Sequence, residues 1–295
     1  MHNKALIVAI VALLASVLVI WGWFPPAMKA GGALGIKHQV SINGLSQSYY
    51  ETGAGPLVIM LPSLGRPASD FNALAVKLNG SGYRTLAFDP PHRVQKSEAP
   101  YDLFSIADLV GKAAAEREQG DHAPVILIGH AFGNRVARAY ATRYPEQVRA
   151  LVLLAAGGRK PITPPVLKAL KRCFDPRLPR WKRTAALHTA FFAQGNAIPA
   201  HWRVGWDRHA AALQGNATAI TPSKYWWAGG DAPMLVIQGD ADAIAPAADT
   251  SVLLTAEYGS RVQVVTASPA WHALLPEQPD FIANAVLAYL HALPE

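Results

Sequence analysis

From residue 38 onward, apolar residues follow two spacings in turn, one typical of β-strands and one typical of α-helices. Short unbroken apolar runs such as residues 56–61 (PLVIML) are typical of strands that are buried on both faces. Segments such as 71–78 (FNALAVKL) carry their apolar residues at the helical spacing instead. The alternation predicts an α/β fold with a mostly parallel central sheet and right-handed crossovers. We expect strands at 56–61, 84–88, 125–128 and 148–154, and helices at 71–78, 105–117 and 133–144.

A hairpin is expected before the first of these strands. Residues 38–42 and 47–51 have a strand-like composition, and Asn43-Gly44 lies between them. An Asn-Gly pair readily adopts the left-handed backbone that a tight turn between antiparallel strands requires. The sheet is therefore expected to begin with an antiparallel pair.

The alternation is interrupted between residues 157 and 230. This stretch is rich in proline and tryptophan, and it is too long for a plain loop in a compact domain. We therefore expect a helical insertion that lies over the sheet as a lid. The pattern then resumes with strands at 234–238 and 262–265 and a helix at 281–293. The expected domains are a core formed by residues 38–156 and 231–295 and a lid formed by residues 157–230.

A separate hydrophobic segment precedes the predicted fold. Residues 5–24 form a run of 20 residues without a charge, which is long enough to span a bilayer as a helix. Trp21 and Trp23 lie where interfacial aromatic residues are usual. A cleaved signal peptide is the alternative, but the following PPAMKAGGALG matches an A-x-A cleavage site poorly. Residues 1–30 are interpreted as a membrane anchor, with the main domain outside the cytoplasm, or as a signal segment of a secreted protein.

Composition excludes several classes of protein. With 51% hydrophobic and 16% charged residues, the chain has ample material for a core and is not a disordered protein. Its single cysteine, Cys173, excludes an internal disulfide framework and a CxxC site. The net charge of +7 comes without a nucleic-acid recognition motif, so no nucleic-acid partner is expected. The chain carries no phosphate-binding loop, dinucleotide-binding glycine pattern or metal-ligand spacing, so neither a cofactor nor a metal is expected.

The first candidate for chemistry lies between a predicted strand and a predicted helix, at residues 129–133 (GHAFG). This segment resembles the G-x-S-x-G nucleophile elbow of the α/β-hydrolase superfamily. The resemblance extends over about residues 38–295 and implies the α/β-hydrolase fold with a capping insertion. The position of the usual nucleophilic serine is occupied by Ala131, whose methyl group cannot attack a carbonyl carbon.

Two further turns resemble the acid and histidine turns of the same superfamily. Residues 238–246 (QGDADAIAP) resemble its G-x-x-D-x-x-x-P turn, which implies that Asp242 is the acid. Asp240 is a close competitor, but the spacing to the glycine and the proline favours Asp242. The turn around His272 resembles the one that carries the catalytic histidine. The order of elbow, acid and histidine matches the superfamily, and Asp242 is expected to orient His272 toward position 131.

An oxyanion hole is implied at residues 61–67 (LPSLGRP), which follow a predicted strand. The superfamily carries an H-G-x-P-like loop at this place, and one backbone N–H of the loop joins the N–H that follows the nucleophile. The matching donors are the amides of Leu64 and Phe132. Pro62 and Ser63 replace the usual histidine and first glycine, which puts the shape of the loop in doubt.

Ala131 leaves more than one interpretation open. The alanine is either natural or a deliberate replacement of serine, and a chain that starts at Met1, keeps its hydrophobic segment and shows no tag favours a natural residue. Three other side chains could replace the nucleophile: the hydroxyl of Ser63, the thiol of Cys173 and the imidazole of His130. Turn formation or simple packing is the more ordinary role of each, so none of them is favoured.

The aromatic residues of the insertion indicate the kind of substrate. Trp202, Trp206 and Trp227 are predicted to line an apolar binding pocket. The predicted function is therefore hydrolysis of a small, largely apolar ester, lactone or related carbonyl compound, with Asp242 and His272 as the base system. Two alternatives remain: a non-catalytic binding protein with the same fold, and a lyase-like enzyme that needs only the His-Asp dyad.

Overall fold

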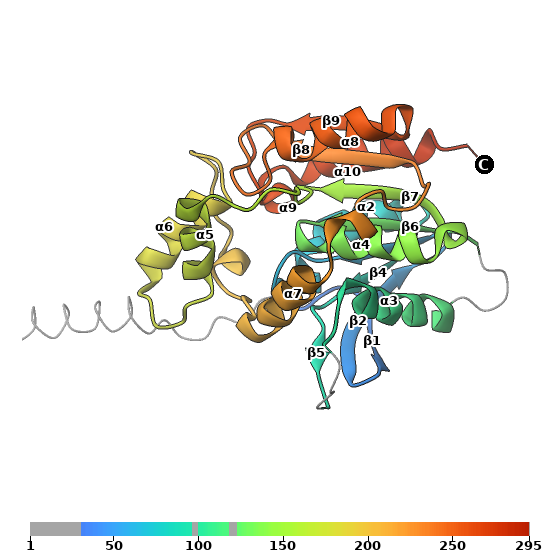
Figure 1. Ribbon diagram of the computed structural model, residues 1–295, viewed down its shortest axis with the longest axis horizontal. Coiled ribbons are helices and arrows are strands. Elements are labelled where there is room, and N and C mark those ends of the chain that lie inside the picture. Colours follow the sequence, from blue (N-terminus) through green and yellow to red (C-terminus); the bar gives the residue numbers. More distant parts are fainter. Residues whose placement is uncertain (1–30, 96–99, 118–122, 295) are drawn as a thin grey trace, which may run out of the picture.

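The computed structural model of this chain describes residues 31–95, 100–117 and 123–294. Nine strands in this part of the chain form one sheet, in the order β1-β2-β4-β3-β6-β7-β8-β9, with β5 paired to β2 (Figure 1). The strands are β1 (Ile36–Ile42), β2 (Leu45–Gly53), β3 (Leu57–Leu61), β4 (Arg84–Phe88), β5 (His92–Arg93), β6 (Val125–His130), β7 (Val148–Leu154), β8 (Met234–Gly239) and β9 (Val262–Ala267). The expected N-terminal hydrophobic helix lies outside the described residues.

The six strands from β4 to β9 along this order are parallel, whereas β1 and β2 form an antiparallel hairpin that joins β4. Asn43 and Gly44 make the hairpin turn with φ angles of 48° and 81°. Two consecutive residues at positive φ are what a tight turn between twisted strands requires. The mostly parallel sheet and its antiparallel start confirm the prediction.

Helices cover both faces of the sheet because the central strands are apolar on both sides. In β3, Leu57, Ile59 and Leu61 pack on one face, and Val58 and Met60 pack on the other. The first face is covered by α3 (Leu103–Arg117), α4 (Phe132–Arg143) and α8 (Ser251–Tyr258), and the second by α2 (Asn72–Gly80), α9 (Leu274–Glu277) and α10 (Pro279–His291). Alternation of side chains along each strand therefore builds two separate cores.

The chain between β7 and β8 is mainly helical. It contains α5 (Pro164–Cys173), α6 (Arg180–Ala190) and α7 (Arg208–Ile220), and short 3₁₀ turns at Ala200–Arg203 and Ser223–Tyr225. Figure 1 shows α5 and α6 as a pair to one side of the sheet. These two helices enclose a third apolar cluster, to which Phe191, Phe192 and Trp202 belong.

No helix in the described ranges combines the length and apolarity needed to cross a bilayer.

Candidate active site

The turn between β6 and α4 holds Ala131 in a strained conformation. Its φ of 50° and ψ of −107° lie in a region that residues with a Cβ rarely adopt. Two close approaches impose the turn: a Cβ on Gly129 would lie 2.5 Å from the backbone of Asn134, and one on Gly133 would lie 2.0 Å from the carbonyl oxygen of Leu61. The side-chain amide of Asn134 also donates to the carbonyl of Ala131. The backbone of a nucleophile elbow is thus formed around a methyl side chain.

Asp242 and His272 are brought together from two separate loops. Nδ1 of His272 lies 2.7 Å from Oδ2 of Asp242, and both residues are buried, with exposures of 3% and 4%. The other carboxylate oxygen accepts hydrogen bonds from the backbone N–H groups of Ile244 and Ala245, at 2.9 and 2.8 Å. A carboxylate beside Nδ1 requires the proton on that nitrogen, so Nε2 keeps its lone pair.

Asp240, the competing acid, serves a different contact. Its carboxylate accepts hydrogen bonds from the hydroxyl of Ser268 and from the backbone N–H of Ala270. The two loops come close because Gly239 has no side chain: a Cβ there would lie 2.2 Å from the carbonyl oxygen of Trp271. Asp240 therefore holds the histidine loop from outside, and Asp242 contacts the imidazole.

His130 fixes the histidine loop from the elbow side. Its Nε2 lies 2.9 Å from the carbonyl oxygen of His272, so this nitrogen carries the proton and donates it. The ring is fully buried, and burial lowers the pKa of His130 to about 4, so the imidazole is neutral at pH 7. This contact places His272 directly beside the elbow, with the two imidazole centroids 6.0 Å apart.

The oxyanion candidates Leu64 and Phe132 lie on two segments that approach each other closely nearby. The close approach of Gly133 to Leu61 and Pro62 sets the end of β3 against the start of α4. Within the described residues, neither the amide of Leu64 nor that of Phe132 donates a hydrogen bond. Phe132 begins α4, where an N–H group has no partner inside the helix. Two unpaired donors are thus available near the elbow.

A buried arginine in the same loop escaped the sequence analysis. The guanidinium of Arg66 makes a two-pronged contact with the carboxylate of Asp70, at 2.8 and 2.6 Å, and donates to the carbonyl of Val204 at 2.7 Å. It also stacks on Trp202 and Trp206, at 4.3 and 4.7 Å from their ring centroids. Arg66 therefore joins the oxyanion loop to the insertion through a paired charge.

Of the three predicted substrate-binding tryptophans, the structure brings Trp202 and Trp206 together beside the ring that contacts His272. Trp202 and Trp206 pack edge-on with each other and against Phe191, whose ring lies 5.6 Å from the imidazole of His272. Trp227 belongs to the cluster that also contains Phe132, not to the one with Trp202 and Phe191, and its contact with a substrate stays a prediction. Its ring lies under the guanidinium groups of Arg138 and Arg159, and its Nε1 donates to Glu257. These three charged side chains hold the indole of Trp227 in place.

Glu277 ties the insertion to the histidine loop, and the sequence analysis gave it no role. Its carboxylate accepts hydrogen bonds from the backbone N–H of Ala193 at 2.6 Å and of Trp271 at 2.8 Å. The side chain of Asn196 donates a third, at 2.9 Å. Burial raises the pKa of Glu277, and these three donors oppose that shift. One carboxylate thereby connects both sides of the site.

The single thiol is not poised for catalysis. Cys173 is buried in the apolar cluster of the insertion and contacts the carbonyl of Ala169 at 3.4 Å. Burial raises the pKa of its thiol to about 12, so almost no thiolate forms near pH 7. In the described part of the chain, no three His, Cys, Asp or Glu side chains gather in a way that could hold a metal ion.

The sheet, the elbow and the three loops at the ends of its strands define an α/β-hydrolase fold. The sequence profile of one hydrolase family, described as serine aminopeptidase, S33, matches residues 54–279. The match spans most of the chain. This chain therefore belongs to that family of hydrolases.

Curated relatives match over shorter stretches. A proline iminopeptidase, PfmaB, of Pestalotiopsis fici is 36% identical over 120 residues, which is 39% of this chain and 42% of the relative. A 2-(acetamidomethylene)succinate hydrolase of Mesorhizobium japonicum is 29% identical over 121 residues, which is 40% of this chain and 42% of the relative. The chain thus spans less than half the length of the curated relatives it matches.

Solved structures share the fold over almost the whole chain. A membrane phospholipase A described as a bacterial virulence factor has a TM-score of 0.70 and 23% identity, covering 99% of this chain and 97% of its own. A hydrolase from Pseudomonas aeruginosa also has a TM-score of 0.70, with 22% identity and coverage of 88% and 99%. At such identities the likeness concerns the fold.

Proposed function

We propose that this protein hydrolyses a small, largely apolar ester, lactone or related carbonyl compound, with His272 as general base and Asp242 as its orienting acid. The observation that carries the proposal is the buried contact of 2.7 Å between these two side chains. It leaves Nε2 of His272 with a free lone pair, next to an elbow and two unpaired backbone donors. A base and an oxyanion site together are the minimum for carbonyl hydrolysis.

Because Ala131 offers no nucleophile, water has to attack the substrate directly. Nε2 of His272 takes a proton from the water as its oxygen bonds to the carbonyl carbon. The N–H groups of Leu64 and Phe132 stabilise the resulting oxyanion. When the bond to the leaving alkoxy oxygen breaks, the imidazolium returns its proton to that oxygen, so an acid and an alcohol result. No acyl-enzyme forms along this route.

The insertion of residues 157–230 acts as a lid in this proposal. Ala131 is 6% exposed and His272 is 3% exposed, so a substrate reaches them only when part of the chain moves aside. Trp202, Trp206 and Phe191 form the apolar side of the closed site and would contact the acyl or alkyl part of the substrate. A closed, dry site strengthens the electrostatic contribution of the oxyanion donors.

Location belongs to the same proposal. The uncharged run at residues 5–24 is expected to anchor the protein in a membrane, with the hydrolase domain outside the cytoplasm, or to direct its secretion if cleaved. A solved structure that shares the fold is described as a membrane phospholipase A, which is compatible with this location. Nothing in the basic charge of the chain calls for a nucleic-acid partner.

One observation favours a second candidate. The elbow holds a methyl group where the superfamily carries its nucleophile, and the site is closed. Such a site can bind a small apolar molecule without converting it, so a non-catalytic binding protein is the second candidate. A lyase-like reaction that uses only the His272–Asp242 dyad needs the same two residues and is tested by the same variants.

The test is the hydrolysis of p-nitrophenyl butyrate by the full chain and by His272→Ala, with His291→Ala as the matched control. His291 is an exposed histidine at the end of α10. Removing the base is expected to reduce the rate by about 10²–10⁴-fold. Equal rates in the chain and in His272→Ala would contradict the proposal. If no form hydrolyses the ester but the chain binds it measurably, the result would favour the non-catalytic binding protein.

A further inference from the structure

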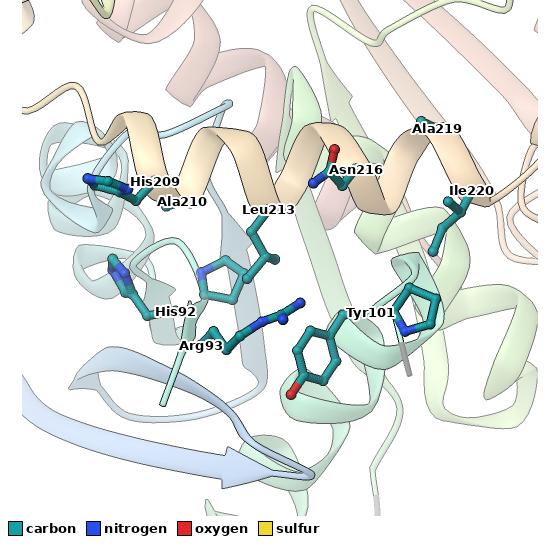
Figure 2. Close-up of a pocket in the computed structure, with 11 residues that line it drawn as sticks. His92, Arg93, Tyr101, His209, Ala210, Leu213, Asn216, Ala219 and Ile220 are labelled. Carbon is teal, nitrogen blue, oxygen red and sulfur yellow. The ribbon is translucent and has the colours of Figure 1, made fainter. Parts of the chain in front are cut away.

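A second cavity lies between α7 and the segment that connects β4 to α3 (Figure 2). Its volume of about 610 Å³ falls within the range of small-molecule pockets, roughly 300–1,000 Å³. Ala131, Asp242 and His272 are not among the residues that line it. The lining residues are Pro91, His92, Arg93, Pro100, Tyr101, His209, Ala210, Leu213, Asn216, Ala219 and Ile220.

The lining combines apolar surface with one permanent positive charge. Figure 2 shows Arg93 between Leu213 of α7 and Tyr101. The guanidinium of Arg93 lies 4.8 Å from the centroid of the Tyr101 ring, and it makes no hydrogen bond or ion pair with another described residue. A guanidinium stacked by its face keeps its N–H edge free for a planar anion. None of the lining residues in the part of the chain that the structure describes is Asp or Glu.

The two histidines of the lining lie at one end of the cavity. Figure 2 places His92 and His209 close to the start of α7. Nε2 of His92 lies 3.6 Å from a carboxylate oxygen of Asp207, which caps α7 through its other oxygen. The carboxylate of Asp207 therefore already has partners at that end. Among the described lining residues, Arg93, next to Leu213, is the permanent cation without a carboxylate partner.

We propose that this cavity binds a small monocarboxylate with an apolar tail. The carboxylate pairs with the N–H edge of Arg93, and the tail lies along Leu213, Ile220 and the proline rings. A carboxylate suits this place because it is planar and takes two parallel N–H donors from one guanidinium. The apolar lining would contribute little to the affinity for a strongly hydrated ion that has no apolar tail.

The cavity is connected to the proposed oxyanion loop through α7. The backbone N–H of Gly65 donates to the side chain of Gln214 at 2.7 Å, and the N–H of Asp207 donates to the carbonyl of Gly65 at 2.9 Å. A Cβ on Gly65 would lie 2.6 Å from the carbonyl oxygen of Asp207, so α7 sits directly on the loop that contains Leu64. A ligand against α7 therefore restrains this loop. A feedback effect of acid products would rest on the proposed function, whereas binding itself does not.

Binding is tested by isothermal titration of the full chain with hexanoate, and with hexanamide as the neutral probe of equal length. Hexanoate is expected to bind, and hexanamide to bind at least about tenfold more weakly, because only the anion pairs with Arg93. Arg93→Gln is expected to weaken hexanoate binding about tenfold or more. Asn216→Asp is also expected to weaken hexanoate binding, because the added negative charge repels the carboxylate. Arg177→Gln, a change of an exposed arginine outside the cavity, is expected to leave it unchanged.

Several outcomes would overturn the inference. They are absence of hexanoate binding, equal affinity for hexanamide, or undiminished affinity in Arg93→Gln. Loss of binding in His272→Ala would place the carboxylate in the catalytic site, which overturns the second site while leaving the proposed function standing. The connection to the loop has its own readout: hexanoate is expected to slow amide hydrogen exchange across residues 61–66 in the unchanged chain but not in Arg93→Gln. Unchanged exchange with bound hexanoate would refute that connection.

Discussion

Nδ1 of His272 and Oδ2 of Asp242 lie 2.7 Å apart, although 29 residues separate them in the sequence. The second oxygen of Asp242 is held by two backbone N–H groups, so the carboxylate cannot rotate freely. The carbonyl of His272 is held in turn by His130. The imidazole is therefore fixed from both sides, by its ring and by its backbone, which is the arrangement expected of a positioned base.

Removing the charge of Asp242 should distinguish its role from that of Asp240. In Asp242→Asn the amide no longer selects the tautomer of His272, and we expect ester hydrolysis to fall by about 10²–10⁴-fold. Asp240→Asn is the matched control, since that carboxylate contacts Ser268 and Ala270. Its rate is expected to change by less than about threefold. Equal losses in both variants, measured with p-nitrophenyl butyrate, would mean that the acids only brace the loops.

Ala131→Ser should create an acyl-enzyme route in the existing frame. The elbow backbone is already formed, so the new hydroxyl would stand beside Nε2 of His272. We expect the hydrolytic rate to rise by about 10²-fold or more, with a burst of p-nitrophenol equal in amount to the enzyme. A fluorophosphonate should label the introduced serine, and the label should vanish when His272→Ala is added. A serine variant with neither burst nor label would show that the frame is not set for nucleophilic attack.

Stability should fall in mild acid because His130 is buried as a neutral ring. Its pKa is about 4 in the folded chain, and it returns to about 6.5 on unfolding. Between these values the unfolded state binds more protons than the folded state. The contribution of His130 to the free energy of unfolding is therefore fully present above pH 6.5 and is lost as the pH falls toward 4. The expected loss is about 3 kcal/mol over that window.

This pH dependence is measured by urea unfolding at several pH values. His130→Asn should remove most of the slope between pH 6.5 and 4, whatever its own stability at pH 7. His188→Asn, which changes an exposed histidine of α6, should keep the slope. An unchanged slope in His130→Asn would show that other groups cause the loss of stability.

Two glycines in helices offer a matched pair for testing the elbow. In Gly133→Ala the new methyl would meet the carbonyl oxygen of Leu61 at 2.0 Å, so we expect a loss of about 3 kcal/mol in the free energy of unfolding. Gly215→Ala in α7 meets nothing within 4 Å and should gain up to about 1 kcal/mol, since alanine favours a helix. Thermal unfolding of the two variants gives the sign of each change. Comparable stability of both variants would mean that the backbone of the elbow can move to accommodate the added methyl group.

Most of the sheet could be predicted from the sequence because its strands are apolar on both faces. The expected strand at 125–128 is β6 (Val125–His130), and the one at 148–154 is β7. The helix α8 (Ser251–Tyr258) was missed, since it is short and buries only Ser251 and Leu254. Such a weak apolar pattern cannot be told from that of a loop.

The candidate site, like the fold, could be predicted from the sequence only in part. Asp242 and His272 could be predicted because the turns that carry them resemble the acid and histidine turns of the α/β-hydrolase superfamily. The contacts of Arg66 and Glu277 with the insertion could not be predicted, because these partners lie far along the chain. Arg66 reaches Val204 across 138 positions, and Glu277 reaches Ala193 across 84. The contacts of Trp227 with Arg138 and Arg159 could not be predicted for the same reason, since they form only in the folded chain.

The positive φ of Ala131 has an evolutionary consequence. The backbone of the elbow is held by Gly129, Gly133 and Asn134, and none of these contacts involves the β-substituent at position 131. The GCN codons of alanine and the TCN codons of serine differ at a single base. One nucleotide change can therefore exchange a methyl and a hydroxymethyl group at this position without rebuilding the backbone that presents it.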